Sequence, residues 1–422
     1  MTFLDDLTWR DAVYDHTPAL AEHLAEAAPV SAYCGFDPTA DSLHVGSLLP
    51  VMTLARLQRA GHRPVALVGG GTGLIGDPSG KRAERTLQTR EQVEANVAGL
   101  RAQLERFLDF DGANAAVMSN NAEWLTSIPL TDFLRDVGKH FTIGYMTAKE
   151  SVRSRVESEV GLSFTEFSYM LLQAYDFLVL NDRLGVTLQI GGSDQWGNIT
   201  AGTDLLRKTR GAKGHGLVMP LVTTASGTKF GKTEAGTVWL DAARTSPYKF
   251  YQFWMGTDDR DVVRYLKFFT WLGKDEVEAL AAEAEQNPGR REAQRTLARE
   301  VTTLVHGADA TEAAERASQA LFGGDLRALD AATLAEVFEE APSSEHPASG
   351  FAGEGMPVVD LFADAALTAS KGEAKRLARS GGLSVNGEKV AEDARVTAAD
   401  AIDGAVLVLR KGKKSYALVR LV

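Results

Sequence analysis

Short apolar runs followed by glycine-rich turns recur along the first half of the chain. Residues 30–34 form the first apolar run, Gly35 interrupts it, and apolar residues then recur with helical spacing over residues 48–57. This order predicts a strand, a loop and a helix. The apolar runs at residues 64–68 and 186–190 are also followed by glycine-rich loops. The pattern therefore predicts a parallel sheet whose strands are joined by helical crossovers.

Further elements follow from the same reasoning. Residues 1–30, 89–110 and 163–179 carry apolar positions at helical spacing, and residues 117–118 and 217–222 are short strand candidates. We expect residues 1–30 to be helical and to cover the main domain. The charges of residues 89–110 are typical of a helix face exposed to solvent.

Composition changes at residues 341–356, a stretch rich in proline, serine and glycine that is typical of a linker. Residues 245–340 before it are helix-rich, and residues 357–422 after it contain a basic helix and an asparagine–glycine turn between short strands. A chain of 422 residues exceeds one typical domain. We therefore expect an α/β domain over residues 1–244, then an α-helical domain, the linker and a small α+β domain.

The balance of charge differs between the body and the tail of the chain. The net charge of −11 argues mildly against nucleic-acid binding over the whole surface. Residues 356–422 contain 11 lysines and arginines and 8 acidic residues, so this segment carries +3 and the remainder −14. A small basic module on an acidic body can bind RNA locally. The lysines of the terminal hairpin have the alternative role of protecting a sheet edge.

The sequence offers no obvious metal centre or membrane anchor. There is one cysteine, Cys34, and the eight histidines show no pair at helical metal-ligand spacing, so we expect no disulfide framework and no protein-bound transition metal. No uncharged apolar run approaches the roughly 20 residues that span a bilayer. The first residues are unlike a secretory or transit peptide. The expected location is the cytoplasm, without a membrane partner.

The loops after the predicted strands carry the candidate chemistry. A helix start presents unpaired N–H groups that favour phosphate, and His44 offers a further donor in the first loop. Taken alone, this turn is equally compatible with an α/β protein that binds no ligand there. Three such loops should lie at the same edge of the sheet, where ligands of open parallel sheets bind. Together they favour a ligand site.

Tyr169, Gln173 and Asp176 form a polar stripe in an otherwise apolar helix. Their spacing places them on one face, which either lines a pocket or meets solvent. The narrowness of the polar face favours the pocket. The loop at residues 223–236, with two lysines, is either a mobile functional loop or an exposed loop whose lysines maintain solubility.

These motifs together resemble those of the bacterial tyrosyl-tRNA synthetases, a family of class I aminoacyl-tRNA synthetases, over essentially the whole chain. The matching segments are YCGFDPTADSLH, GDPSGK, GGSDQWGN and the polar stripe. His44-Val45-Gly46-Ser47 resembles the HIGH element, with Ser47 in place of the second histidine. Residues 229–233 resemble the KMSKS loop and keep both lysines, although Phe, Gly and Thr replace the usual Met, Ser and final Ser.

The resemblance implies a Rossmann-type parallel-sheet catalytic domain, an α-helical domain and a small S4-like RNA-binding domain. It implies a ligase that activates L-tyrosine with ATP to tyrosyl-adenylate and pyrophosphate, and then transfers tyrosine to the 3′ end of tRNA(Tyr). The first step needs no general base, because the attacking carboxylate is already ionised near neutral pH. It needs in-line positioning and positive charge on the phosphates. ATP would bring Mg²⁺ with it, and a homodimer is implied.

The resemblance also implies roles for individual residues. Phosphate contacts and catalysis are implied for Thr39, His44, Lys81, Arg85, Lys229 and Lys232. Tyrosine binding is implied for Tyr33, Asp77, Tyr169, Gln173, Asp176 and Gln195, with Tyr33 and Asp176 at the phenol. ATP binding is implied for Cys34, Gly35, Asp37, Gly46, Ser47, Gly191, Gly192, Asp194, Lys232 and Thr233. RNA contacts are expected from the basic residues Lys371, Lys375, Arg376, Arg379, Lys411, Lys413 and Lys414.

Two other functions stay open at this point. A tryptophanyl-tRNA synthetase is the nearest, but Tyr33, Asp176 and the S4-like tail argue against it. The other is a non-catalytic RNA-binding protein on a synthetase scaffold, with Ser47 as an early sign of decay. Retention of both loop lysines and of the polar residues Asp77, Gln173 and Asp194 argues against that function. Tyrosine-dependent exchange between ATP and pyrophosphate separates the three.

Overall fold

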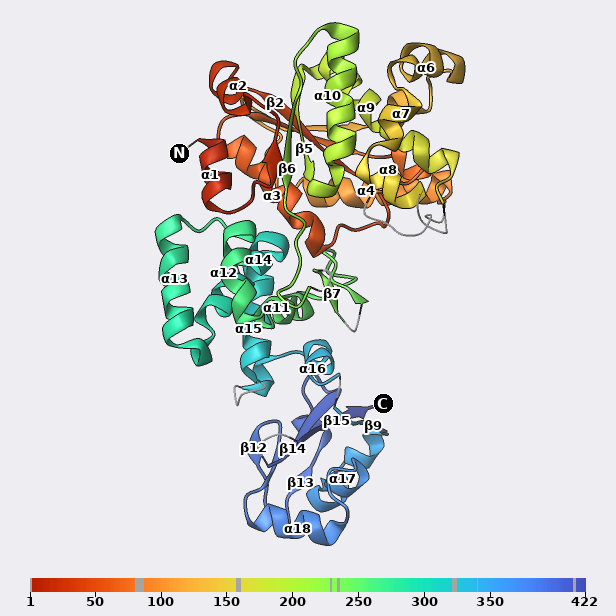
Figure 1. The fold of residues 1–422 in the computed structure, drawn as a ribbon. Helices are drawn as coiled ribbons and strands as arrows, with labels where there is room; N and C mark the ends of the chain where they lie inside the picture. The colour runs from red at the N-terminus through yellow and green to blue at the C-terminus, as the bar shows by residue number, and fades with distance from the viewer. Residues whose placement is uncertain are drawn as a thin grey trace. The chain divides into compact units, whose positions relative to one another are not determined.

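A computed structural model of the chain describes residues 2–79, 87–156, 161–227, 230–233, 236–320, 325–339, 341–412 and 415–422 (Figure 1). The chain forms two compact units, Met1–Thr245 with Thr257–Leu297, and Ser246–Gly256 with Ala298–Val422. The helices expected over residues 245–340 are therefore shared between the units. The domain boundaries expected from the sequence stay predictions.

The first unit is built on a sheet with the strand order β1-β6-β5-β2-β3-β4. β2 to β6 run parallel, and β1 pairs with β6 in the antiparallel direction. The parallel sheet predicted from the apolar runs is confirmed, whereas β1 lies within a segment expected to be helical. The strands are β1 (Asp15–His16), β2 (Ser31–Phe36), β3 (Arg63–Val68), β4 (Val117–Asn120), β5 (Val186–Gly192) and β6 (His215–Met219).

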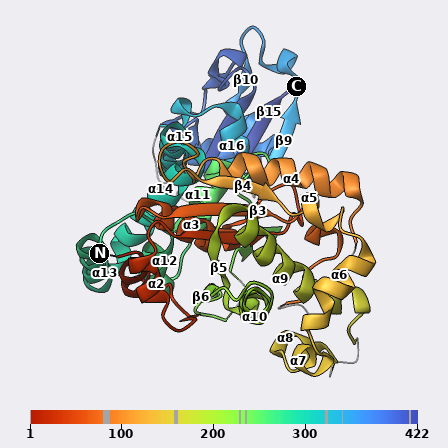
Figure 2. The ribbon, with the colours of Figure 1, turned by 90° about the horizontal axis from the view of Figure 1, so that it is seen from above.

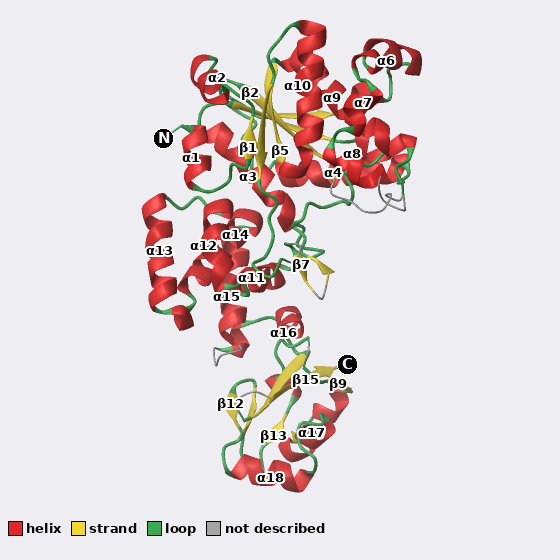
Figure 3. Cartoon of the chain, viewed as in Figure 1, coloured by secondary structure: helices red, strands yellow, loops and turns green. Residues whose placement is uncertain are grey.

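Helices cover both faces of this sheet (Figures 2 and 3). α3 and α4 pack on one face, and α9 and α10 pack on the other. The residues of β2 and β3 are accordingly almost all buried, as in sheets covered on both sides. The helices are α1 (Phe3–Trp9), α2 (Leu20–Glu26), α3 (Leu48–Arg59), α4 (Arg90–Leu104), α5 (Ala122–Leu125), α6 (Leu130–Asp136), α7 (Ile143–Thr147), α8 (Glu150–Val156), α9 (Phe164–Leu184), α10 (Trp196–Arg210), α12 (Asp259–Phe269) and α13 (Lys274–Gln286).

The order of the strands reverses beside β2. From β2 the chain proceeds outward to β3 and β4, and it then returns to the other side of β2 with β5 and β6. The crevice outside the carboxyl ends of β2 and β5 is therefore the expected ligand position of the fold.

α9 presents the polar stripe to this crevice. The Ser163 hydroxyl caps its start by accepting a hydrogen bond from the Glu166 amide at 3.2 Å, and Gly185 ends it in the left-handed region. Its apolar residues, among them Phe177 and Leu180, pack with β3 and α10 in one cluster. The helix is thus fixed at both ends and along its apolar face.

The second unit contains a sheet with the order β12-β11-β14-β15-β9. The asparagine–glycine turn is confirmed, since Asn386 and Gly387 have φ of +48° and +87° between β11 and β12. The segment expected to be a linker contributes β9, which pairs with the last strand, β15, in the parallel direction. The strands are β9 (Ser343–His346), β10 (Met356–Pro357), β11 (Leu383–Val385), β12 (Glu388–Lys389), β13 (Arg395–Val396), β14 (Val406–Lys411) and β15 (Ser415–Leu421).

The helices of the second unit are α11 (Pro247–Met255), α15 (Ala308–Ala320), α16 (Ala331–Val337), α17 (Val358–Asp364) and α18 (Lys371–Arg379), while α14 (Glu292–His306) spans the division between the units. α18 is the basic helix of the sequence, and the Ser370 hydroxyl caps its start. Within the described part of the chain, no helix combines the length and the apolar character needed to cross a membrane.

Candidate active site

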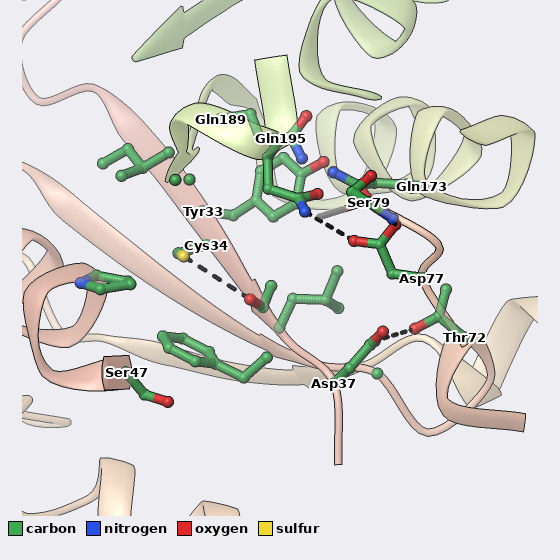
Figure 4. Close-up of a pocket in the computed structure, with 18 of the residues that line it drawn as sticks. Tyr33, Cys34, Asp37, Ser47, Thr72, Asp77, Ser79, Gln173, Gln189 and Gln195 are labelled. Atoms are coloured by element: carbon green, nitrogen blue, oxygen red, sulfur yellow. Dashed lines mark hydrogen bonds between the residues drawn. The ribbon is translucent and has the colours of Figure 1, made fainter. Parts of the chain in front are cut away.

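A cavity of about 330 Å³ opens at the carboxyl ends of β2 and β5 (Figure 4). One face of α9 and the loop after β3 complete its walls, so the prediction that the polar stripe lines a pocket is confirmed. The sequence-proposed residues that line it are Tyr33, Cys34, Gly35, Asp37, Gly46, Ser47, Asp77, Tyr169, Gln173, Asp176, Gly191, Gly192, Asp194 and Gln195.

The cavity is lined by acidic side chains. Asp37, Asp77, Asp176 and Asp194 contribute carboxyl groups, and the described residues around the cavity include no lysine, arginine or histidine. Such a lining attracts the positively charged part of a ligand, such as an ammonium group.

Asp176 is held by two donors at the bottom of the cavity. The Trp124 indole N–H donates to its Oδ1 at 2.7 Å, and the Asn121 amide donates to its Oδ2 at 3.0 Å. Burial raises the pKa of Asp176 to about 7, although the two hydrogen bonds lower it. The side chain is only 2% exposed. Its oxygens keep lone pairs that can accept a further hydrogen bond.

The sequence reasoning missed both of these donors. Asn121 follows β4 directly, so the rule that placed the other loops at the sheet edge could have identified it. Trp124 carries no comparable sequence signal.

Tyr33 is fully buried, and its hydroxyl has no hydrogen-bond partner among the described residues. Its ring packs edge-on against Phe177, with the ring centroids 5.4 Å apart. Burial and the nearby Asp176 charge hold the pKa of Tyr33 well above its usual value, so the hydroxyl keeps its proton. The neighbouring Cys34 is also buried, which raises the pKa of its thiol to about 12.

A second network joins Asp77 to α9 and α10. The Gln195 amide donates to Asp77 Oδ2 at 2.7 Å, and the backbone N–H of Ser79 donates to Asp77 Oδ1 at 2.9 Å. The Asn198 amide donates to Gln173 Oε1 at 3.1 Å and to Gln195 Oε1 at 3.2 Å. Asn198 and Ser79, which the sequence reasoning did not single out as site residues, thus orient three of the proposed ones.

Asp37 and Tyr169 meet across the cavity. The Tyr169 hydroxyl donates to Asp37 Oδ2 at 2.8 Å, and the Thr72 hydroxyl donates to Asp37 Oδ1 at 2.8 Å. Burial raises the pKa of Tyr169 well above its usual value, and the charges of Asp37 and Asp77 raise it further. Both oxygens of Asp37 are therefore oriented before any ligand binds.

A smaller cavity of about 230 Å³ lies beyond Asp37 and is lined by Thr39, together with Gly73, Ile75, Gly76, Leu87 and Gln88. His44 lies outside the lining of both cavities. Its Nδ1 accepts a hydrogen bond from the Gly46 amide at 3.0 Å, so the neutral ring carries its proton on Nε2 and can donate from there. A Cβ at Gly46 would lie 2.8 Å from the His44 ring, so a larger residue there would displace the ring from this position.

The described part of the lysine loop packs against this turn. β7 (Lys232–Thr233) and β8 (Gly236–Thr237) form a small hairpin. Before it, the Phe230 ring stacks on Phe269 with centroids 5.5 Å apart. Gly231 has φ of +76°, and a Cβ there would lie 2.5 Å from the Val45 side chain. The turn and the loop, nearly 190 residues apart in sequence, are therefore side by side.

Lys232 is an exposed residue of this hairpin. Thr233 follows it in the same strand. Lys81, Arg85 and Lys229 lie outside the described residues, as do Lys413 and Lys414 of the tail.

The described basic residues proposed for RNA contact lie on α18 and at the end of β14, but most are paired with acids. Their ion pairs are Lys371–Asp360 at 3.0 Å, Lys375–Glu392 at 3.9 Å, Arg379–Glu392 at 2.7 Å and Lys411–Glu373 at 3.3 Å. Arg376 is an exposed residue of α18.

Two family models match the chain. The first, described as tRNA synthetases class I (W and Y), matches residues 25–323. The second, described as Tyrosine--tRNA ligase SYY-like C-terminal domain, matches residues 333–419. A tyrosine–tRNA ligase from Roseiflexus castenholzii is 56% identical over 423 residues, which cover 100% of this chain and 100% of that protein. One from Geobacillus stearothermophilus is 54% identical over 425 residues, with the same coverage.

Solved structures give the same result at the level of the fold. A C-terminally truncated mitochondrial tyrosyl-tRNA synthetase from Aspergillus nidulans is 32% identical, with a TM-score of 0.69 over 76% of this chain and 94% of that chain. A tryptophanyl-tRNA synthetase from Encephalitozoon cuniculi superposes with a TM-score of 0.54 over 73% of this chain and 87% of that chain, but at 14% identity it shows the shared fold alone.

Proposed function

The chain belongs to the tyrosine–tRNA ligases of class I, and from this membership we propose how its cavities carry out the reaction. It is an ATP-dependent aminoacyl-tRNA ligase that activates L-tyrosine and transfers it to tRNA(Tyr). The predicted class I fold, with a parallel sheet, a helical region and a C-terminal domain containing a sheet, is confirmed.

The phenol of tyrosine binds at the buried pair of Tyr33 and Asp176, and this pair is the observation that carries the proposal. The phenol donates to the Asp176 carboxylate and accepts from the Tyr33 hydroxyl, which has no partner among the described residues. Phenylalanine would leave the Tyr33 hydroxyl buried and unpaired and would make no hydrogen bond to Asp176, a selection principle for which this family is the known illustration. Tryptophan, with a larger ring and no hydroxyl, fits the pair poorly.

The ammonium group binds at the acidic side of the cavity. Asp77 and Gln173 line this side of the cavity, Gln195 orients Asp77, and Tyr169 contributes with Asp37. The four carboxyl groups of the lining support this assignment, because carboxylates attract a positively charged ammonium group.

ATP occupies the outer part of the cavity, between the ends of β2 and β5. Gly35, Gly46, Gly191 and Gly192 allow the nucleotide to approach the backbone, and Ser47 stands at the start of α3. The Asp194 carboxyl group and the Cys34 thiol contact the ribose, and Asp37 lies near the α-phosphate. Mg²⁺ enters with the ATP phosphates.

Thr39, His44 and Lys232 stabilise the leaving pyrophosphate, together with Thr233 of the same hairpin. Thr39 lines the smaller cavity, and the packing of Gly231 against Val45 supports a shared role for the turn and the loop. Lys81, Arg85 and Lys229 serve the same phosphates in the proposal, although they lie outside the described residues. These basic side chains supply the positive charge that the phosphates need.

The tail binds tRNA, and the enzyme acts as a cytoplasmic homodimer. Arg376 and the lysines of α18 face outward and can exchange their acidic partners for phosphates, because ion pairs between exposed side chains contribute little. For the dimer, the support is four apolar residues on the neighbouring helices α6, α7 and α9 that stay exposed, which we term the apolar patch: Leu130, Leu134, Ile143 and Phe164, with exposed fractions from 50% to 78%. The domains proposed are residues 1–244, 245–340 and 357–422, with residues 341–356 between the last two.

The test is exchange of labelled pyrophosphate into ATP with tyrosine, tryptophan and phenylalanine as separate substrates. We expect exchange with tyrosine at far lower concentration than with the other two amino acids. Exchange that depends on tryptophan would favour a tryptophanyl-tRNA synthetase instead. Absence of exchange with every amino acid, in a protein that still binds tRNA, would favour the non-catalytic RNA-binding function.

A further inference from the structure

Asp261 of α12 is a buried carboxyl group that the sequence motifs do not include. It lies in the first turn of the helix, and the residue is only 3% exposed. Its Oδ2 accepts a hydrogen bond from the backbone N–H of Ala225 at 2.7 Å, and its Oδ1 accepts from the Arg264 guanidinium at 2.6 Å. Hydrogen bonds to a charged acceptor are stronger than those between neutral groups. Asp261 therefore ties α12 firmly to the start of the lysine loop.

Two further residues of α12 bind the same part of the loop. The Arg264 guanidinium donates to the Thr223 carbonyl at 2.5 Å, and the Tyr265 hydroxyl donates to it at 3.1 Å. Asp261 and Arg264 are three residues apart on one helix face, so their ion pair orients the guanidinium for this contact. The Thr223 carbonyl and the Ala225 N–H are thus both bound by one helix.

α12 also contacts the loop five residues further on. The Phe230 ring centroid lies 4.9 Å from that of Tyr265 and 5.5 Å from that of Phe269. In the sequence, Phe230 follows Lys229 directly and precedes Lys232 by two residues. One helix therefore anchors the chain both ahead of the loop lysines and between them.

We propose that Asp261 is a positioning residue of the ligase reaction, which fixes the start of the lysine loop so that Lys232 reaches the phosphates of ATP. The inference rests on the proposed function, because that function assigns Lys232 to the leaving pyrophosphate. Asp261 lies outside the lining of both cavities described above, so it acts through the loop. Precise placement matters here, since a displacement of about 1 Å can slow a reaction by about 10²-fold.

The loop allows this hydrogen bond to be removed without a change in α12. The Gly227 N–H donates to the Thr224 carbonyl at 2.8 Å, which closes a β-turn with Ala225 at its second position. Ala225 is not among the described residues with positive φ, and proline is favoured at the second position of such turns. Ala225→Pro should therefore keep the turn and remove only the N–H that Asp261 binds.

Asp261→Asn removes one acceptor from the same contact. The amide has the size of the carboxyl group, but its NH₂ group would face either Ala225 or Arg264, both of which donate. We expect the rate constant of adenylate formation at saturating tyrosine and ATP to fall by about tenfold in Asp261→Asn and in Ala225→Pro. The Kd for tyrosine should stay within about twofold of the parent, since neither residue lines the cavity.

Asp259→Asn is the matched control. Asp259 lies in the same turn of α12, but its Oδ1 accepts from the Gln294 amide at 2.6 Å. The variant removes the same charge from the same helix start, where acidic side chains stabilise the helix. It should leave adenylate formation unchanged. An equal slowing by Asp259→Asn and Asp261→Asn would overturn the proposal, because the stability of α12 would then control the rate.

Combination with Lys232→Ala shows whether Asp261 acts through the lysine. Stopped-flow measurement on the full-length protein gives the rate constants of the parent, the single variants and the double variant. Once Lys232 is absent, Asp261→Asn should slow adenylate formation by less than about threefold, whereas independent effects would multiply. Full multiplication would assign Asp261 a role unrelated to the lysine and would overturn the proposal.

The remaining outcomes are also decisive. A rate constant that is unchanged in either Asp261→Asn or Ala225→Pro overturns the proposal, and so does a loss of tyrosine affinity equal to the loss of rate. Ala225→Pro alone carries the test where Asp261→Asn does not fold. The parent protein is assayed first: absence of tyrosine-dependent exchange in the parent refutes the proposed function itself, whereas an active parent with unchanged variants refutes only the role of Asp261.

Discussion

At the scale of single residues, the cavity combines polar groups that are already oriented with groups that wait for a ligand. Asp176 accepts from Trp124 and Asn121 before any substrate arrives. The Tyr33 hydroxyl, by contrast, is buried and unpaired in the described structure. The oriented carboxyl group sets the position of the bound hydroxyl, and the unpaired group makes its absence unfavourable.

Tyr33→Phe should weaken selection more than it weakens catalysis. The change removes a hydroxyl that the free protein leaves unpaired, so stability without ligand should hardly change. The preference for tyrosine over phenylalanine should fall by about tenfold, because one hydrogen bond to the phenol is lost. Steady-state exchange with both amino acids checks this, and an unchanged preference would remove Tyr33 from the phenol site.

Asp176 should make the stability of the free protein depend on pH. Burial raises its pKa to about 7, above the value near 4 of an unfolded chain. Between these values the folded state binds more protons than the unfolded state, so the stability contributed by this group is present below pH 4 and is lost as the pH rises to 7. The expected change is at most about 4 kcal/mol.

The measurement is the difference in free energy of unfolding between the parent and Asp176→Asn, from pH 4 to pH 9. Subtracting the variant removes the other titrating groups to first order. The difference should favour the parent at low pH, decline toward pH 7 and level off above it. A difference that is flat or that rises with pH would show that Asp176 is ionised throughout.

Whether the sequence could identify a site residue depends on whether its contacts lie within one element or join elements that are distant in the sequence. Asp176 could be predicted because its partners in the stripe, Tyr169 and Gln173, are on the same helix face and spacing alone places them together. Trp124 could not, because its contact with Asp176 depends on how the segment after β4 packs on α9. Gln189 of β5 also lines the cavity, but it lies between the apolar residues Leu188 and Ile190 and leaves no periodic pattern.

At the scale of elements, two motifs distant in the sequence form one structure. The backbone N–H of Val45 donates to the Val238 carbonyl at 3.0 Å, and the Leu240 N–H donates to the Leu43 carbonyl at 2.9 Å. Phe230, buried against Phe269, anchors the start of the loop. Sequence reasoning identified both motifs from their residues, but the pairing between them involves backbone groups that no side-chain pattern encodes.

Lys232→Ala should therefore affect the phosphate chemistry and spare tyrosine binding. The exposed lysine sits on the hairpin, away from the lining of the acidic cavity. Loss of one positive charge aimed at a leaving pyrophosphate should slow adenylate formation by about 10²-fold. Stopped-flow measurement of adenylate formation checks the rate, and equilibrium dialysis checks that tyrosine affinity is kept.

Lys274→Ala is the control for loss of an exposed lysine. Lys274 begins α13 and pairs with Glu278 at 3.7 Å, outside the lining of both cavities. It should leave adenylate formation unchanged. An equal slowing by the two variants would mean that net charge, and not the hairpin lysine, controls the rate.

At the scale of the whole molecule, the apolar patch is the feature that the fold of one chain leaves unexplained. α6, α7 and α9 pack together through buried residues such as Phe133, Met146 and Leu171. Leu130, Leu134, Ile143 and Phe164 lie on the same elements but remain exposed. The apolar positions of these short helices could be read from the sequence, but which of them stay exposed depends on the tertiary packing.

Phe164→Asp should convert the proposed dimer to monomers. A carboxylate placed in an apolar interface has to be desolvated without a partner, which is strongly unfavourable. Sedimentation equilibrium at micromolar concentration gives the mass. Tyr14→Asp, at an exposed tyrosine outside the patch, is the control and should keep the parent's mass. A monomeric parent, or a dimeric Phe164→Asp variant, would contradict the proposed assembly.

The position of β15 in its sheet determines when that sheet can form during synthesis of the chain. β15, Ser415–Leu421, follows β9 and β14 in the chain, yet it lies between them and pairs with both. Domains generally fold as the chain emerges, with the N-terminal parts first. β9 and β14 therefore have to wait, with an unpaired edge each, until β15 has been synthesised and has left the ribosome. The sheet of the second unit can thus close only after its last strand emerges.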